Sequence, residues 1–116
     1  MNKYKEIYGI DISKSVFDVY GSETGHDQFK NDEQGFKSFL RHIPKGALVV
    51  MEATGYYHYR LAQFLYKSGK LVSVVNPLSV KRFIQMKLAK VKTDKSDAKA
   101  ICEYGQMNEV PLYTAL

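Results

Sequence analysis

Two aspartates, Asp94 and Asp97, lie three residues apart in the lysine-rich stretch KVKTDKSDAKAICEYG, residues 90–105. On a helix, a spacing of three brings two side chains to one face, so both carboxylates would point the same way. Such a pair can bind a hard divalent cation. It can also be an N-cap and a first-turn acid that stabilise the start of a helix. Taken alone, the pair favours capping slightly, and the two roles are compatible.

Two further acids follow apolar segments. Asp11 lies near the end of YKEIYGIDI, residues 4–12, and Glu52 follows the apolar run ALVVM, residues 47–51. Asp11 could be a simple strand-end acid that begins a turn, whereas a charge directly after a buried run such as that before Glu52 needs a reason. If both strands are parallel neighbours, their carboxyl ends meet at a crevice where α/β proteins form sites. Gly9, on the same face as Asp11, would leave room there.

Four converging carboxylates would repel one another and raise one another's pKa. Divalent cations with oxygen ligands remove this cost. Two ions about 3.5–4 Å apart can activate a water and stabilise the leaving oxygen in phosphodiester cleavage. We therefore expect Asp11, Glu52, Asp94 and Asp97 to share one site for Mg²⁺ or Mn²⁺, with two ions.

The elements that must position these acids can be predicted from periodicity. Alternating or continuous apolar residues indicate strands, and apolar residues at helical spacing indicate helices. The predicted strands are 4–12, 15–21, 26–31, 47–51 and 71–75. The predicted helices are 31–43, 54–69, 77–89, and a last one from 93 or 94 to 104. Pro77 suits a first turn, and Gly69 and Gly105 are interpreted as helix stops.

A meander of three strands followed by strand–helix units, with right-handed crossovers, predicts an α/β fold. The sheet would be mixed and five-stranded, in the order 3-2-1-4-5, with helices on both faces. This is the layout of the ribonuclease H-like fold. It places Asp11 and Glu52 at the ends of adjacent parallel strands.

Composition supports one folded domain over residues 1–116, because 45% of residues are hydrophobic and 13% aromatic. No run has the length of a membrane span, and the N-terminus lacks the apolar core of a secretory signal. A single cysteine, Cys102, fits a cytoplasmic location, and the three histidines have no zinc-type spacing. Most tyrosines are expected to be structural, with Tyr57 in the core, while Tyr56 or Tyr59 could stack on nucleobases.

The net charge of +5 lies entirely in residues 81–99, which hold seven basic and two acidic side chains. Such a cluster attracts polyanions. By charge alone, a basic helix face that only contacts solvent is an equally good interpretation. We expect these residues to bind nucleic acid. They are Lys81, Arg82, Lys87, Lys90, Lys92, Lys95 and Lys99.

Four segments in order resemble the N-terminal, RuvC-like domain of DEDD transposases of the insertion-sequence-110 family, to which pilin-gene-inverting recombinases are related. They are GIDISKSVFDV around Asp11, MEATGYY around Glu52, VVNPLSVKRF (74–83), and KTDKSDAKAI around Asp94 and Asp97. The resemblance implies that these acids are the D-E-D-D set. It also implies magnesium-dependent cleavage and strand transfer of DNA, directed by a structured guide RNA.

The same resemblance implies a second, C-terminal domain with a nucleophilic serine, which residues 1–116 do not include. We therefore expect a catalytic domain that does not recombine DNA by itself, and a homo-oligomer for the full-length protein.

Three other classes of protein compete with this interpretation. Sugar kinases and actin-like ATPases share the fold and a GID strand, but they use a glycine-rich phosphate turn where this chain has Ser13 and Lys14. A Holliday-junction resolvase would share fold, metal and four acids. A catalytically silent nucleic-acid-binding module would share only the basic surface. A titration with Mg²⁺ or Mn²⁺ separates such a module from a metal-dependent enzyme.

Overall fold

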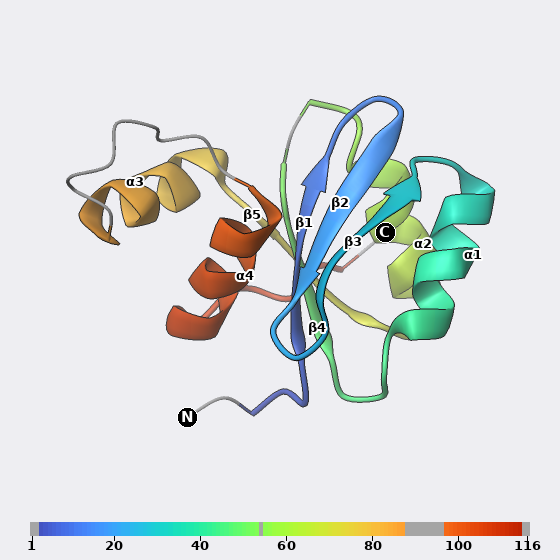
Figure 1. The fold of residues 1–116 in the computed structure, drawn as a ribbon, viewed down its shortest axis with the longest axis horizontal. Coiled ribbons are helices and arrows are strands. Elements are labelled where there is room, and N and C mark those ends of the chain that lie inside the picture. The colour runs from blue at the N-terminus through green and yellow to red at the C-terminus, as the bar shows by residue number, and fades with distance from the viewer. Residues whose placement is uncertain (1–2, 54, 88–96, 115–116) are drawn as a thin grey trace.

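One mixed sheet of five strands forms the centre of the molecule, in the order β3-β2-β1-β4-β5 (Figure 1). The computed structural model describes residues 3–53, 55–87 and 97–114. The strands are β1 (Ile7–Ile12), β2 (Val16–Gly21), β3 (Gly25–Lys30), β4 (Leu48–Glu52) and β5 (Leu71–Val75). β1 pairs antiparallel with β2 and parallel with β4, which confirms the predicted order and directions.

Helices cover both faces of the sheet, as predicted. They are α1 (Glu33–His42), α2 (Tyr59–Lys67), α3 (Pro77–Lys87) and α4 (Ala98–Met107). α1 and α2 lie on one side of the sheet, and α3 and α4 lie on the other (Figure 1). Within the part of the chain that the structure describes, every helix is too short or too polar to traverse a lipid bilayer.

The alternation of side chains along β1 determines which residues face α4. Tyr8, Ile10 and Ile12 belong to the core beneath α1 and α2. Ile7 belongs to the core on the α4 side, so Gly9 and Asp11 face that side as well. β4 is buried on both faces, as its continuous apolar run predicts, and its Leu48 and Val50 share the α4 side. Glu52, two residues beyond Val50, therefore points to the same side as Asp11.

α2 begins later than predicted. The periodic residues Leu61 and Leu65 are fully buried, as expected, but the helix starts at Tyr59 rather than at residue 54. Gly55 has a φ of 55°, and a turn occupies residues 55–58. The prediction that Tyr57 lies in the core is wrong, because this residue is in the turn and its side chain is 46% exposed.

α4 is shifted towards the C-terminus relative to the prediction. It begins at Ala98, with Asp97 as N-cap, and continues to Met107. The interpretation of Gly105 as a helix stop is wrong, because Gly105 is a buried residue inside α4. A Cβ atom there would lie 2.8 Å from Val50 Cγ2, so this glycine lets the helix pack closely on β4.

Candidate active site

Asp11 and Asp97 line one pocket, although 86 positions separate them in the chain. Asp11 is half-buried near the carboxyl end of β1, and Asp97 is exposed at the N-terminus of α4. The residues that line the pocket are Asp11, Asp18, His26, Asp27, Gln28, Asp97 and Ala98. The structure thus brings together two of the four predicted carboxylates.

The close approach of α4 to β1 explains this convergence. A Cβ atom at Gly9 would collide with the carbonyl oxygen of Ala98 and lie 2.9 Å from Cys102 Cα. Only a residue without a side chain permits a backbone to come so near. The first turn of α4 therefore lies against β1 two residues before Asp11, and this contact positions Asp97.

Asp97 is the N-cap of α4. Its backbone is extended, with φ −127° and ψ 176°, and its Oδ1 accepts a hydrogen bond of 2.8 Å from the backbone N–H of Ala100. The interpretation of Asp97 as a first-turn acid is therefore wrong. A carboxylate has a second oxygen, so capping is compatible with metal binding.

Glu52 lies on the strand next to Asp11 and on the same side of the sheet. The parallel register pairs Gly9 with Val50 and Ile10 with Met51, and continuing it by one residue sets Asp11 beside Glu52. Neighbouring strands are about 4.8 Å apart. Glu52 is half-buried, but it is not among the residues that line the pocket of Asp11 and Asp97.

The fourth predicted acid, Asp94, lies outside the described residues. Among residues 3–53, 55–87 and 97–114, no group of three or more His, Cys, Asp or Glu side chains is arranged to hold a metal ion. The carboxylate oxygens of Asp11, Glu52 and Asp97 are the donor type that Mg²⁺ and Mn²⁺ prefer. By chemistry and by side of the sheet these residues fit such an ion. The shared site of four acids stays a prediction.

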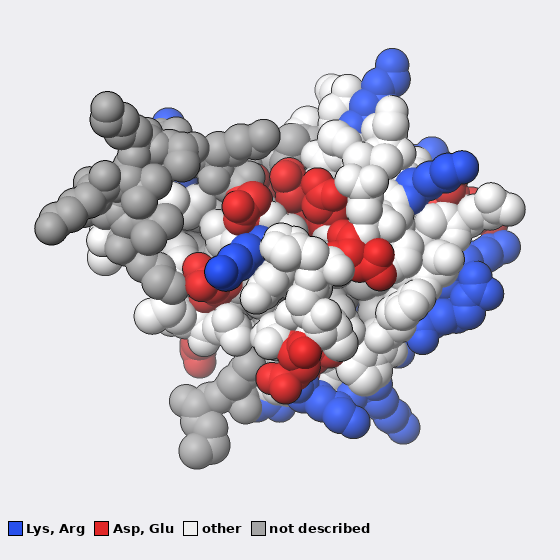
Figure 2. All heavy atoms as spheres, viewed as in Figure 1, with Lys and Arg blue, Asp and Glu red and all other residues white. Residues whose placement is uncertain are grey.

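Acidic side chains gather over the middle of the face that Figure 2 shows, and most basic side chains lie towards its edges. Of the predicted basic residues, Lys81 and Arg82 are exposed on α3 and Lys99 on α4. Lys99 Nζ lies 6.0 Å from the centroid of the Tyr20 ring. Lys90, Lys92 and Lys95 lie outside the described residues, and Lys87 is described only as part of α3. The basic nucleic-acid surface stays a prediction.

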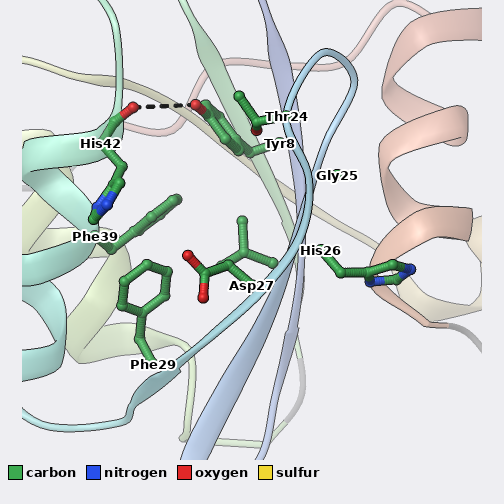
Figure 3. A pocket seen from close by; sticks show the side chains of 9 residues that line it. Tyr8, Thr24, Gly25, His26, Asp27, Phe29, Phe39 and His42 are labelled. Atoms are coloured by element: carbon green, nitrogen blue, oxygen red, sulfur yellow. Dashed lines mark hydrogen bonds between the residues drawn. The ribbon is translucent and has the colours of Figure 1, made fainter.

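Four further pocket residues on β2 and β3 were missed by sequence reasoning: Asp18, His26, Asp27 and Gln28. Asp18 lies directly opposite Asp11 in the antiparallel β1–β2 register, and its Oδ1 accepts a 2.7 Å hydrogen bond from Gln28 Nε2. His26 points to the α4 side of the sheet, whereas its neighbour Asp27 points to the α1 side (Figure 3). The sequence contained a signal for Asp18, because this residue is the charged one within the apolar strand VFDVYG. The short hairpin between β1 and β2 fixes the register of the two strands and so sets Asp18 opposite Asp11.

A buried carboxylate precedes β1, at the opposite end of this strand from Asp11. Glu6, only 4% exposed, accepts hydrogen bonds from the Tyr8 hydroxyl and from the backbone N–H groups of Glu23 and Thr24. The Thr24 hydroxyl donates a further one of 2.9 Å. Burial, reinforced by the hydrogen bond to Glu6, raises the pKa of Tyr8 to about 12. Glu6 thereby ties the turn between β2 and β3 to β1.

Comparisons with known proteins identify the family of this chain. A family model for DEDD transposases of the insertion-sequence-110 type, described as transposase, matches residues 8–114. The pilin gene-inverting proteins of Moraxella bovis and Moraxella lacunata are each 32% identical over 118 residues, covering 94% of this chain. The chain spans 37% of the length of each of these relatives.

The fold has a match among solved structures. RuvC of Thermus thermophilus aligns with a TM-score of 0.58 at 15% identity, covering 93% of this chain and 99% of RuvC. This likeness confirms the ribonuclease H-like, RuvC-like fold. The family model matches residues 8–114, which is nearly the whole chain. The chain therefore belongs to the DEDD transposase family of the insertion-sequence-110 type.

Proposed function

We propose that residues 1–116 form the catalytic domain of a DNA transposase or site-specific recombinase, which cleaves phosphodiester bonds with the help of divalent metal ions and transfers the strands. The observation that carries this proposal is the shared pocket of Asp11 and Asp97 at the carboxyl end of β1. Membership of a transposase family gives the reaction class.

Asp11, Glu52, Asp94 and Asp97 would hold two Mg²⁺ or Mn²⁺ ions. When bound, such ions lower the pKa of a water and neutralise the leaving oxygen. The chain's own contribution is to fix the ligands. β1 and β4 are held in parallel register, and the contact of α4 with Gly9 sets the position of Asp97.

DNA is the proposed substrate, and the basic residues between 81 and 99 would bind its phosphates. By resemblance to the family, a guide RNA would direct the full-length protein, and a further domain would complete strand transfer. The length of the pilin gene-inverting proteins leaves room for such a domain, since this chain covers 37% of each. A homo-oligomer would align two DNA strands.

A metal titration followed by NMR tests the proposal. Addition of Mg²⁺ to the ¹⁵N-labelled chain should shift the amide signals around Asp11, Glu52, Asp94 and Asp97, and Mn²⁺ should broaden the same signals. The variant Asp11→Asn should bind Mg²⁺ at least about tenfold more weakly. Asp32→Asn, in the N-cap of α1 on the other side of the sheet, is the matched control and should bind normally. Uniform, unlocalised shifts would refute the metal site.

A further inference from the structure

Three tyrosines that follow β4 are exposed to solvent, two in the turn of residues 55–58 and one at the first position of α2. Tyr56, Tyr57 and Tyr59 follow Glu52 at the end of β4, and their exposed fractions are 85%, 46% and 49%. Aromatic rings contribute most to binding when a partner covers them, so three exposed rings within four residues indicate a contact surface.

Two of these rings are spaced to accept a flat group. The Tyr59 ring stacks on the buried His58 ring, with centroids 4.4 Å apart and an interplanar angle of 28°. The Tyr56 ring lies 6.5 Å from the Tyr59 ring, at an angle of 30°. Stacked bases repeat about every 3.4 Å, so a base between two rings needs a ring separation of about 6.8 Å. The centroid distance of 6.5 Å is close to this value, and rotation of the exposed Tyr56 side chain would have to bring the two tilted rings face to face.

The rings lie at the same end of the sheet as the proposed site. β1 and β4 are parallel, so the turn after β4 stands at the end where Asp11 and Glu52 lie. In Figure 1 this turn precedes α2 at the end of the sheet that also carries the β1–β2 hairpin. Arg60 is exposed next to Tyr59 in the chain, with its guanidinium carbon 5.7 Å from the centroid of the Phe36 ring. Its positive charge on this surface favours a phosphate-bearing ligand over an uncharged one.

We infer that Tyr56 and Tyr59 hold an unpaired nucleobase of the DNA strand next to the bond that is cleaved. The inference rests on the proposed function, and it narrows the substrate to DNA with unpaired nucleotides at the site. A base inside a duplex already stacks on both faces and cannot enter between two rings. An unpaired base can, and every base offers a π face, so recognition tolerates sequence.

The test uses a short single-stranded DNA that carries 2-aminopurine, whose fluorescence is quenched by stacking, and a duplex of the same length. Wild type should quench the single strand. Tyr56→Leu and Tyr59→Leu keep apolar area but lose the aromatic face, and they should abolish quenching and weaken single-strand binding about 5- to 150-fold each. Duplex binding should change less than twofold.

Two control variants sharpen the test. Tyr56→Phe keeps the ring and should retain quenching, and Tyr66→Leu removes a tyrosine at the other end of α2 and should behave as wild type. If wild type binds Mg²⁺ and duplex DNA, and the two leucine variants still quench 2-aminopurine and bind single strands normally, this inference is overturned while the proposed function stands. If wild type binds neither Mg²⁺ nor any DNA, the inference and the proposed function fail together.

Discussion

Gly9 of β1 lies directly against the backbone of Ala98, the first residue of α4. This contact joins the two halves of the candidate site, because Asp11 is two residues after Gly9 and Asp97 is one residue before Ala98. The geometry of the site depends on the absence of a side chain at a position that is not itself a ligand.

The variant Gly9→Ala should therefore push α4 away from β1. Overpacking of this kind lowers the free energy of unfolding by about 1–3 kcal/mol. Because Asp97 moves with α4, Mg²⁺ binding should also weaken, which urea unfolding and a metal titration measure separately. Gly105→Ala is the control in the same helix, because its Cβ would meet the side-chain atom Val50 Cγ2 rather than backbone. Normal Mg²⁺ binding by Gly9→Ala would contradict the positioning role.

Substitutions of Asp97 should separate its capping role from its proposed metal role. Asn caps a helix about as well as Asp, so Asp97→Asn should keep stability and weaken Mg²⁺ binding. Asp97→Ala should weaken Mg²⁺ binding as well, and its free energy of unfolding should be about 1 kcal/mol lower than that of wild type. The matched control is Asp32, which caps α1 with the same 2.8 Å hydrogen bond, to Gly35 N–H. Asp32→Ala should lose similar stability and bind Mg²⁺ normally. If Asp97→Asn binds Mg²⁺ as wild type does, Asp97 is only a cap.

Stability should decrease in alkaline solution. Burial, with smaller contributions from Glu103 and Glu6, raises the pKa of Cys102 from 9.0 to about 12, and the pKa of Tyr8 rises from 10.0 to about 12. A raised pKa means that the folded state favours the neutral form. The stabilisation is complete below the unfolded pKa and is lost as pH rises towards the folded pKa. Each group should lower the free energy of unfolding by about 1.4 kcal/mol per pH unit, Cys102 from pH 9 and Tyr8 from pH 10.

Urea unfolding at pH 8, 9, 10 and 11 measures this dependence, and Cys102→Ala isolates the thiol. Between pH 9 and 10 the variant should lose the slope that wild type shows, because Tyr8 begins to contribute only above pH 10. The native thiol should also be unreactive towards thiol reagents at pH 8, since Cys102 is fully buried and its Sγ donates to the Ile7 carbonyl oxygen. An equal slope in both proteins would show that Cys102 ionises as easily in the folded chain.

The sheet could be predicted from the sequence because each strand has its own local signal. The run LVVM is buried on both faces, as a continuous apolar run predicts, and Glu52 follows it directly. The alternation of side chains in β1 places Asp11 on one side of the sheet. The positions of these two acids could therefore be predicted from hydrophobic periodicity and the order of the strands. The order of the strands then follows from tight turns and right-handed crossovers.

The start and end of α4 could not be predicted locally. Asp94 and Asp97 both have the chemistry of a cap, and the choice between them depends on where α4 meets Gly9 across the sheet. The role of Gly105 was also ambiguous from the sequence alone. A glycine can end a helix or allow close packing, since both use the missing Cβ, and only the distance to Val50 distinguishes them.

The last prediction concerns the basic residues of 81–99, which we propose to offset the negative charge of the pocket around Asp11 and Asp97. The carboxylates of Asp11, Asp18 and Asp97 line that pocket, so a polyanion can approach only if cations nearby attract its phosphates. We expect the triple variant of Lys87, Lys90 and Lys92 to alanine to weaken binding of all duplexes alike, because phosphate contacts carry no sequence information. The measurement is a series of duplex dissociation constants from low to high salt.

In that salt series, the logarithm of the affinity should fall linearly with the logarithm of the salt concentration, with a slope of about −0.9 for each phosphate contact. Loss of three contacts should therefore flatten the slope by about 2.7. The control variant replaces Arg41, Lys45 and Lys67, three exposed basic residues outside the segment, and removes the same charge. If proximity to the acids matters, only the first variant flattens the slope. Equal slopes in wild type and the first variant would mean that these lysines form a solvated face and bind no phosphate.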